Sequence, residues 1–159
     1  RARGVGHMLP APAIVSDVDL GRRLRNEPSV ARTLAVAPRS DILVFSPGVL
    51  EEESVLVRSG FLTERGMERL RAMGAVTDIF SRFLDMSGEP VSQELEERTI
   101  AIPLDAVRQA KRSVAVASSL VKAVPMLVAL RSRLATAAVV DEELAKEILL
   151  LGRLGAEGH

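Results

Sequence analysis

The sequence predicts an α/β fold in which helices cover a mostly parallel β-sheet. From Asp41 onward, short apolar runs alternate with segments of helical periodicity, a pattern typical of parallel sheets. The continuous apolar run over residues 42–45 predicts a strand that is buried on both faces, because helices cover both sides of such sheets. The chain has 159 residues, 47% of them hydrophobic and 26% charged, which is enough for one domain with an aliphatic core.

Two short helices are expected before the sheet. The segment Ser16-Asp17-Val18-Asp19 resembles a helix cap, and Leu20 and Leu24 suit one face of the helix that follows. Pro28 interrupts this helix and restarts it, because proline is well tolerated only in the first turn of a helix.

The first strand of the sheet ends sharply at Ser46-Pro47-Gly48. Thr63 can cap the next helix, and Gly74 stands where a left-handed C-terminal cap is expected. The apolar face of this helix is predicted to consist of Met67, Leu70 and Met73.

Beyond Gly74 the chain alternates between strands and helices. Helices are predicted to start at Pro103, Ser118 and Asp141. Strands are predicted over residues 75–80, 99–102, 114–117 and 137–140, with a hairpin or short β excursion over residues 83–91. The inner faces of the last two helices are predicted to carry Val121, Val124, Val128 and Leu130, and Leu144, Ile148 and Leu151. Residues 1–152 form the expected domain, and residues 153–159 a loose tail.

Composition excludes several classes of function. Lys and Arg together balance Asp and Glu at 21 each, so no global field draws the chain to nucleic acid or to an anionic membrane. The absence of cysteine excludes disulfides and thiolate metal sites, and fits a reducing cytoplasm. His7 and His159 stand in terminal segments without partners, so we expect no catalytic histidine, no metal site and no cofactor. No apolar run approaches the roughly 20 residues of a membrane-spanning helix, and we expect a cytoplasmic protein.

Polar residues at the carboxyl ends of the predicted strands are candidates for a ligand site. In open α/β sheets ligands bind beyond these ends, where helix N-termini present free N–H groups. Ser46 and Gly48 follow the first strand, and a plain strand-terminating turn is the alternative there. Ser118 begins a helix with Lys122 one turn in, an arrangement that suits an anion, although a capped helix with a surface lysine would look the same.

The third candidate end carries Asp78 and Arg82. A carboxylate can accept hydrogen bonds from sugar hydroxyls, and a guanidinium can clamp a phosphate. A structural ion pair is an equally good interpretation of either residue alone. The Ser-x-x-Lys spacing formed with Lys122 also occurs in penicillin-binding enzymes, but no Ser-Asp-Asn or Lys-Thr-Gly motif accompanies it, so no catalytic residue is assigned.

An ordered set of segments resembles one known family. The sequence is similar to the C-terminal sugar-binding domain of SorC-type bacterial transcription regulators from about Leu9 to Leu151. No single motif carries this resemblance, which rests on the order of the whole set. The segments are Leu9-Pro10-Ala11-Pro12, Glu27-Pro28-Ser29-Val30, residues 41–44, Ser59-Gly60-Phe61-Leu62, residues 74–79, residues 82–85 with Gly88, Lys122-Ala123 and Val140-Asp141-Glu142.

The resemblance implies an effector domain that works together with a DNA-binding domain. It implies a Rossmann-like sandwich related to sugar-phosphate isomerases, a phosphorylated sugar as effector, and a homo-oligomer, either dimer or tetramer. DNA would be bound by a helix-turn-helix domain outside this chain, and an N-terminal truncation of the effector domain is expected. The family pattern places Lys122 at the lysine that reaches the ligand, Asp78 at the acidic ligand position, and Arg58 close to a phosphate contact.

The sequence departs from the family pattern at several close-approach positions. Ser46-Pro47-Gly48 replaces a Gly-Ile-Gly-like turn, and Ser118-Ser119 replaces paired glycines. Thr77 and Ser81 also stand where glycine is usual, so the pocket is expected to be narrower or reshaped. Pro125 is tolerable only if it lies in the first turn of its helix.

Three functions remain open at this point. The leading hypothesis is a sensor domain in which a sugar phosphate shifts the balance between subunit arrangements and so alters the affinity of the full protein for DNA. The second is an isomerase or deaminase-like enzyme, for which Asp78 is the one candidate base. The third is an oligomerisation module that has lost its ligand, which the glycine replacements support.

Overall fold

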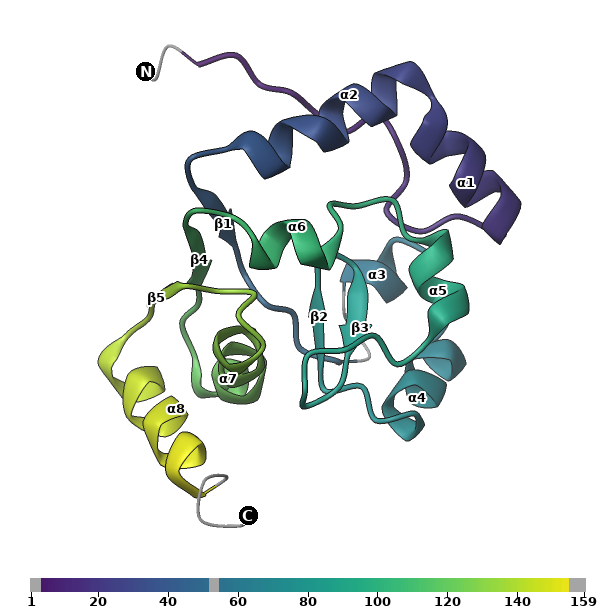
Figure 1. The fold of residues 1–159 in the computed structure, drawn as a ribbon. Helices are drawn as coiled ribbons and strands as arrows, with labels where there is room; N and C mark the ends of the chain where they lie inside the picture. Colours follow the sequence, from purple (N-terminus) through teal and green to yellow (C-terminus); the bar gives the residue numbers. More distant parts are fainter. Residues whose placement is uncertain (1–3, 52–54, 155–159) are drawn as a thin grey trace.

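The N-terminal part of the chain forms a helical pair that packs across the rest of the molecule. The computed structural model describes residues 4–51 and 55–154 (Figure 1). Asp17 caps α1 (Val18–Asn26) by accepting a hydrogen bond from the Leu20 amide at 2.8 Å. Extended Glu27 separates α1 from α2 (Pro28–Val36), whose first residue is Pro28. The interruption and restart expected at this proline are confirmed.

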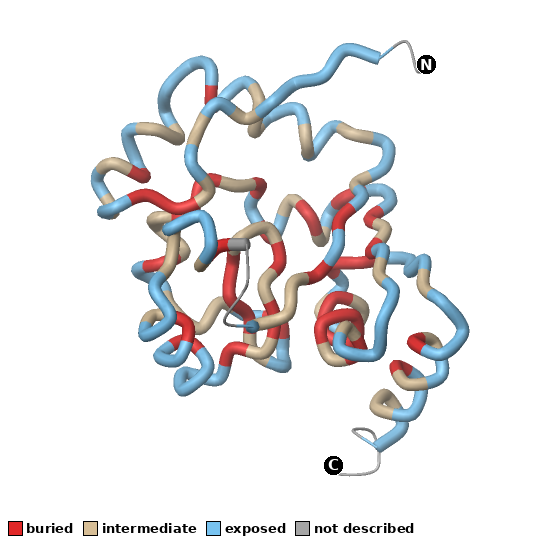
Figure 2. Tube along the Cα trace, turned by 180° about the vertical axis from the view of Figure 1, so that it is seen from behind, coloured by how far each residue is buried: buried red, intermediate tan, exposed pale blue. Residues whose placement is uncertain are grey.

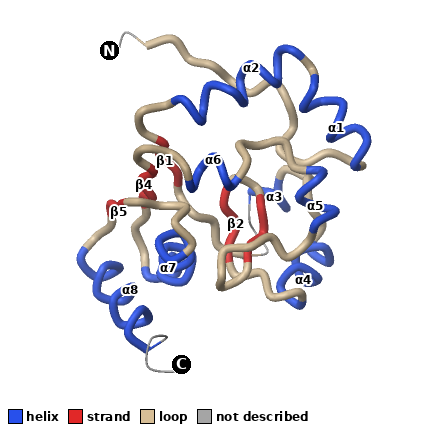
Figure 3. The backbone as a smooth tube through the Cα atoms, viewed as in Figure 1, coloured by secondary structure: helices blue, strands red, loops and turns tan. Residues whose placement is uncertain are grey.

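A three-stranded parallel sheet follows, and it confirms the α/β fold class. A single turn, η1 (Ala37–Arg39), leads into β1 (Leu43–Phe45), which pairs with β4 (Ser113–Val116). β4 pairs in turn with β5 (Ala137–Val139), so β4 is the central strand. Because all three strands are parallel, their carboxyl ends meet at one edge of the sheet (Figure 3).

One face of the sheet carries the main core. Phe45 and Ala115 point to this face, which α7 (Ala123–Arg131) covers, and α8 (Glu142–Leu154) packs against α7 and adds Leu144 and Ile148 to the same core. Five consecutive residues of α7 from Pro125 to Ala129 are buried, so this helix is enclosed on nearly every side (Figure 2). Pro125 is the third residue of α7 and therefore lies in its first turn, as its tolerance requires.

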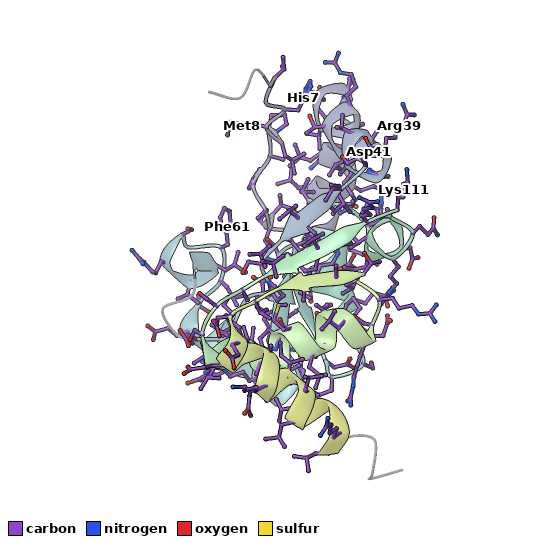
Figure 4. All side chains as sticks on the ribbon, turned by 90° about the vertical axis from the view of Figure 1, so that its left-hand side faces the viewer. His7, Met8, Arg39, Asp41, Phe61 and Lys111 are labelled. Atoms are coloured by element: carbon purple, nitrogen blue, oxygen red, sulfur yellow. The ribbon has the colours of Figure 1, made fainter. Side chains whose placement is uncertain are left out.

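The opposite face of the sheet is bare, in that no described segment of the chain covers it. Val44 and Val139 expose 66% and 58% of their surface, and Ile42 and Val116 are also exposed. Figure 4 looks from this side, with the three strands lying in front of α7. The expectation that residues 42–45 are buried on both faces is therefore wrong, because the apolar run packs through alternate residues only.

A separate hairpin occupies the middle of the chain. β2 (Thr77–Ile79) and β3 (Arg82–Leu84) are antiparallel, and the turn between them is formed by Phe80 and Ser81, which both have positive φ. The strand predicted over residues 75–80 thus exists in shorter form, but it pairs in a hairpin and not in the parallel sheet. Residues 83–91 contribute β3 and a further bridge between Leu84 and Pro90.

The hairpin packs on a second, smaller core formed with three short helices. These helices are α3 (Val55–Arg58), α4 (Glu64–Ala72) and α5 (Gln93–Arg98). Thr63 caps α4 as expected, and Gly74 has the left-handed φ of +95° that its position predicted. Met67 and Leu70 are buried, whereas Met73 is 44% exposed at the C-terminal cap, so the third apolar position was wrong.

Three further predictions differ from the structure. Residues 99–102 make a single bridge between Ile14 and Thr99 instead of a strand, and α5 before them was not foreseen. Val121 is exposed on the short turn η2 (Leu120–Lys122) that precedes α7. α8 continues to Leu154, two residues past the expected domain boundary at 152, and residues 155–159 lie outside the described part of the chain.

The helix expected to begin at Ser118 begins later, because η2 starts at Leu120 and α7 at Ala123. The helices expected at Pro103 and Asp141 are confirmed. α6 (Leu104–Arg108) begins after Pro103, and α8 begins after Asp141, whose carboxylate accepts a hydrogen bond from the Leu144 amide at 2.8 Å. Within the described residues, no helix combines the length and the hydropathy that a membrane crossing requires.

Candidate functional site

The carboxyl ends of the three parallel strands border an open hollow of about 760 Å³. Its floor is apolar and includes three valines of the bare sheet face, and its rim is polar. The valines are Val44, Val116 and Val139, and the polar rim consists of Ser46, Ser118, Lys122 and Asp141. This combination of an apolar floor and a few convergent polar groups is typical of small-molecule sites.

Lys122 is the cation of this rim. The residue lies in η2, after β4, and its ammonium group donates a hydrogen bond to the carbonyl oxygen of Pro47, after β1, at 2.6 Å. The positive charge is thus held between the ends of two neighbouring strands. The sequence-predicted residues Ser46, Ser118 and Lys122 come together here.

Asp78 and Gly48 form the connection between the hairpin and the end of β1. The Gly48 amide donates to the Asp78 carbonyl oxygen at 2.6 Å, and the Thr77 hydroxyl donates to the Gly48 carbonyl oxygen at 2.9 Å. A Cβ atom on Gly48 would lie 2.9 Å from Oδ2 of Asp78. Only glycine at position 48 therefore allows these two backbone segments to approach each other this closely.

The carboxylate of Asp78 is electrostatically unusual. Burial raises its pKa to about 6, although the Ser81 amide and the charge of Lys122 act in the opposite direction. Its Oδ1 atom is buried and has no hydrogen-bond partner among the described residues. Asp78 does not line the hollow itself, but its interactions with Lys122 and Gly48 place it beside the strand ends.

Two predicted site residues lie elsewhere. The Arg82 side chain is 4% exposed, and its Nε donates to both carboxylate oxygens of Glu96 at 2.7 Å. Its Nη1 donates to the Ile102 carbonyl oxygen at 2.8 Å, so Arg82 holds β3 against α5 and the loop beyond it. Arg58 is exposed at the end of α3 and does not border the hollow.

Asp141 is a part of the site that sequence reasoning missed. Asp141 was expected only as a helix cap, yet its Oδ2 also accepts a hydrogen bond from the Ser119 amide at 3.2 Å. These amide hydrogen bonds, first that of Leu144 and then that of Ser119, lower the pKa of Asp141. The available signal was a polar residue directly after a strand, but the sequence does not reveal that β5 lies beside β4.

The arrangement suits an anionic ligand better than a metal. The helical segment over residues 120–131 directs its N-terminus toward the strand ends, where first-turn amides lack partners within the helix. Among the described residues, no cluster of His, Asp and Glu side chains could hold a metal ion.

The family of the chain follows from its similarity to known proteins. The model of the family described as "Putative sugar-binding domain" matches residues 1–150. The chain belongs to this sugar-binding domain family. This membership and the relatives below confirm the resemblance to sugar-binding domains of SorC-type regulators.

The relatives are named as regulators of transcription. The chain is 28% identical over 141 residues to the deoxyribonucleoside regulator of Bacillus subtilis, which covers 89% of this chain and 45% of that protein. It is 31% identical over 147 residues to the transcriptional regulator LsrR of an Enterobacter species, covering 91% and 46%. The crystal structure of a transcriptional regulator from Streptococcus pneumoniae matches with a TM-score of 0.83 at 25% identity, covering 92% and 56%. The chain spans about half the length of the curated relatives it matches.

Proposed function

We propose that the chain is the ligand-sensing domain of a sugar-responsive transcriptional regulator and that it binds a phosphorylated sugar in the hollow. The observation that carries the proposal is the position of the Lys122 ammonium group between the ends of β1 and β4. Family membership supports the sugar, and the local chemistry supports the phosphate.

The phosphate would be held by one cation, hydroxyl groups and main-chain amides. Lys122 supplies the charge, Ser46 and Ser118 supply hydroxyl donors, and the first turn of η2 supplies N–H groups at the positive end of a helix dipole. The valine floor would then cover an apolar face of the sugar ring. Each of these groups acts in binding, so no catalytic step is needed.

Asp78 would accept a hydrogen bond from a sugar hydroxyl group. Its Oδ1 atom is buried without a partner, and an unsatisfied buried acceptor costs free energy that a ligand donor would recover. Reaching this atom requires a shift of the neighbouring Gly48 segment, which contacts the carboxylate. Such a shift would move the end of β1 when ligand binds.

Titration calorimetry tests the phosphate site through a matched pair of lysines. Ribose 5-phosphate and glucosamine 6-phosphate should bind saturably, and ribose itself should bind weakly or not at all. The Lys122→Gln variant should lose about tenfold in affinity, because it removes a charged hydrogen-bond donor. Lys111→Gln is the control, since Lys111 is exposed at the opposite, amino end of β4 (Figure 4). The absence of measurable binding to any pentose or hexose phosphate would contradict the proposal. An equal loss of affinity in Lys122→Gln and Lys111→Gln would also contradict it.

In the whole protein, the bound sugar would shift the equilibrium between subunit arrangements of a homo-oligomer and change its affinity for DNA. The DNA would be contacted by a helix-turn-helix domain outside these 159 residues. The lengths of the relatives support such an arrangement. Operator-binding assays on the full protein with and without sugar phosphate test this step, and an unchanged affinity would contradict it.

A specific observation favours one alternative, an isomerase or deaminase-like enzyme. Burial raises the pKa of Asp78 to about 6, which is suitable for a general base at neutral pH. Turnover of ribose 5-phosphate or glucosamine 6-phosphate, lost in Asp78→Asn, would establish the enzyme. Saturable binding without turnover would exclude it for these substrates.

A further inference from the structure

One carboxylate joins the edge of the hollow to the start of the last helix. Oδ1 of Asp141 accepts a hydrogen bond from the Leu144 amide at 2.8 Å and so caps α8. Oδ2 of the same residue accepts from the Ser119 amide at 3.2 Å. The two oxygens therefore accept hydrogen bonds from different elements: one from the first turn of α8 and one from the loop between β4 and η2.

The loop that receives the second contact is strained. Ser119 has φ of +85° and ψ of 134°, a backbone region that only glycine enters without cost. A residue remains in such a conformation only when surrounding contacts hold it there. The described hydrogen bond of the Ser119 amide is the one to Asp141.

The conformation of Ser119 determines where the cation of the rim lies. The Lys122 amide donates to the Ser119 carbonyl oxygen at 3.1 Å, which closes the turn η2. The Lys122 ammonium group then reaches the Pro47 carbonyl oxygen across the strand ends. A rotation of the Ser119 backbone would therefore move both the first-turn amides and the lysine.

We propose that Asp141 is a positioning residue of this ligand site: its Oδ2 holds Ser119 in the strained conformation that directs the first turn of η2 and Lys122 toward the ligand. The role is separate from the capping of α8, which uses Oδ1. The effect on ligand affinity rests on the proposed function, whereas the effect on the loop does not.

The variant Asp141→Asn separates the capping of α8 from the contact with the Ser119 amide. Asparagine caps helices as well as aspartate, but its second atom is an NH₂ donor that cannot accept from the Ser119 amide. Asp17→Asn is the matched control, because Asp17 caps α1 through the same 2.8 Å contact to a main-chain amide, in a helix outside the rim. Asp141→Ser, which retains one capping oxygen, repeats the test in case the asparagine variant folds poorly.

Amide hydrogen exchange gives the readout that needs no ligand. The Ser119 and Lys122 amides should exchange about tenfold faster in Asp141→Asn than in the wild type, because a hydrogen bond to a charged acceptor is lost. They should be unchanged in Asp17→Asn. In a Ser119→Gly background the effect on Lys122 should shrink, because glycine adopts this conformation without a restraint. Equal exchange in Asp141→Asn and Asp17→Asn would overturn the proposal.

Affinity for ribose 5-phosphate is the second readout. Asp141→Asn should weaken binding several-fold, Asp17→Asn should not, and the Ser119→Gly/Asp141→Asn double variant should recover most of the loss. Faster exchange together with no binding in the wild type would refute the sugar-phosphate function and leave the positioning role of Asp141 intact. Unchanged exchange together with normal binding would refute the positioning role alone.

Discussion

At the scale of single residues, the charge state of Asp78 is the property with the clearest consequence. Its pKa is raised to about 6 by burial, so the folded protein holds this proton more tightly than the unfolded chain does. Between pH 4 and 6 the contribution of Asp78 to stability therefore decreases as the pH rises. Above pH 6 the ionised carboxylate remains as a cost to the folded state.

The variant Asp78→Asn isolates this cost. At pH 7.5 it should raise the free energy of unfolding by up to about 3 kcal/mol, because the variant has no carboxyl group whose pKa burial raises from 3.8 to about 6. At pH 4, where Asp78 is protonated in the folded protein, the two proteins should differ little. Urea unfolding at both pH values measures the difference. A variant that is equally stable or less stable at pH 7.5 would contradict the burial of an ionised group here.

Residue types alone were sufficient to predict three of the four polar residues of the rim. Ser46, Ser118 and Lys122 could be predicted because the carboxyl ends of parallel strands meet at one edge. Arg82 could not be assigned correctly, since its direction depends on the hairpin turn at Phe80 and Ser81. No glycine marks that turn, so the sequence carries no signal for it.

At the scale of secondary-structure elements, Arg82 connects β3 to α5. Its guanidinium is buried, paired with Glu96, and bonded to the Ile102 carbonyl oxygen. Arg82→Met removes the charged donor that Glu96 and the Ile102 carbonyl oxygen share, and should destabilise the fold by about 2–3 kcal/mol, since the Glu96 carboxylate that is left behind is only partly buried. Arg58→Met, on an exposed position of α3, should change stability by less than about 0.5 kcal/mol.

Thermal and urea unfolding of both arginine variants measure this contrast. If Arg82→Met folds, its affinity for ribose 5-phosphate should equal that of the wild type, because Arg82 does not border the hollow. A stable Arg82→Met protein with lost affinity would show instead that this guanidinium contacts the ligand.

Elements with local end signals could be predicted, and elements without them could not. Asp17, Pro28, Thr63 and Asp141 each begin a helix where the sequence places a cap or a proline. α5 is six residues long with Leu95 as its one buried residue, so it has no apolar periodicity to detect. Ile100 and Ile102 are apolar and buried, although the main chain of residues 99–102 makes only one bridge.

At the scale of the whole molecule, the sheet is covered on one face and bare on the other. A continuous apolar run looks the same in both situations, which is why the sequence could not distinguish them. Phe45 points to the core, where its ring contacts Phe80 at 5.0 Å between centroids, while the adjacent Val44 points to the bare face.

Alanine substitutions at these neighbours measure the asymmetry. Phe45→Ala should cost about 3 kcal/mol or more, because it leaves a cavity in the main core. Val44→Ala should cost about 0.5 kcal/mol, since the side chain is 66% exposed. Chemical unfolding of both variants tests the difference. Equal losses would mean that the valine face is covered in solution.

The proposed function requires that a sugar phosphate binds where the parallel strands end. The decisive measurement is amide chemical-shift mapping by NMR during a titration with ribose 5-phosphate. We expect the largest changes on Ser46, Gly48, Ser119, Val121 and Asp141. Changes confined to the cleft between α4 and α5, which Arg69 and Arg98 line, would contradict it, as would a spectrum that ligand leaves unchanged.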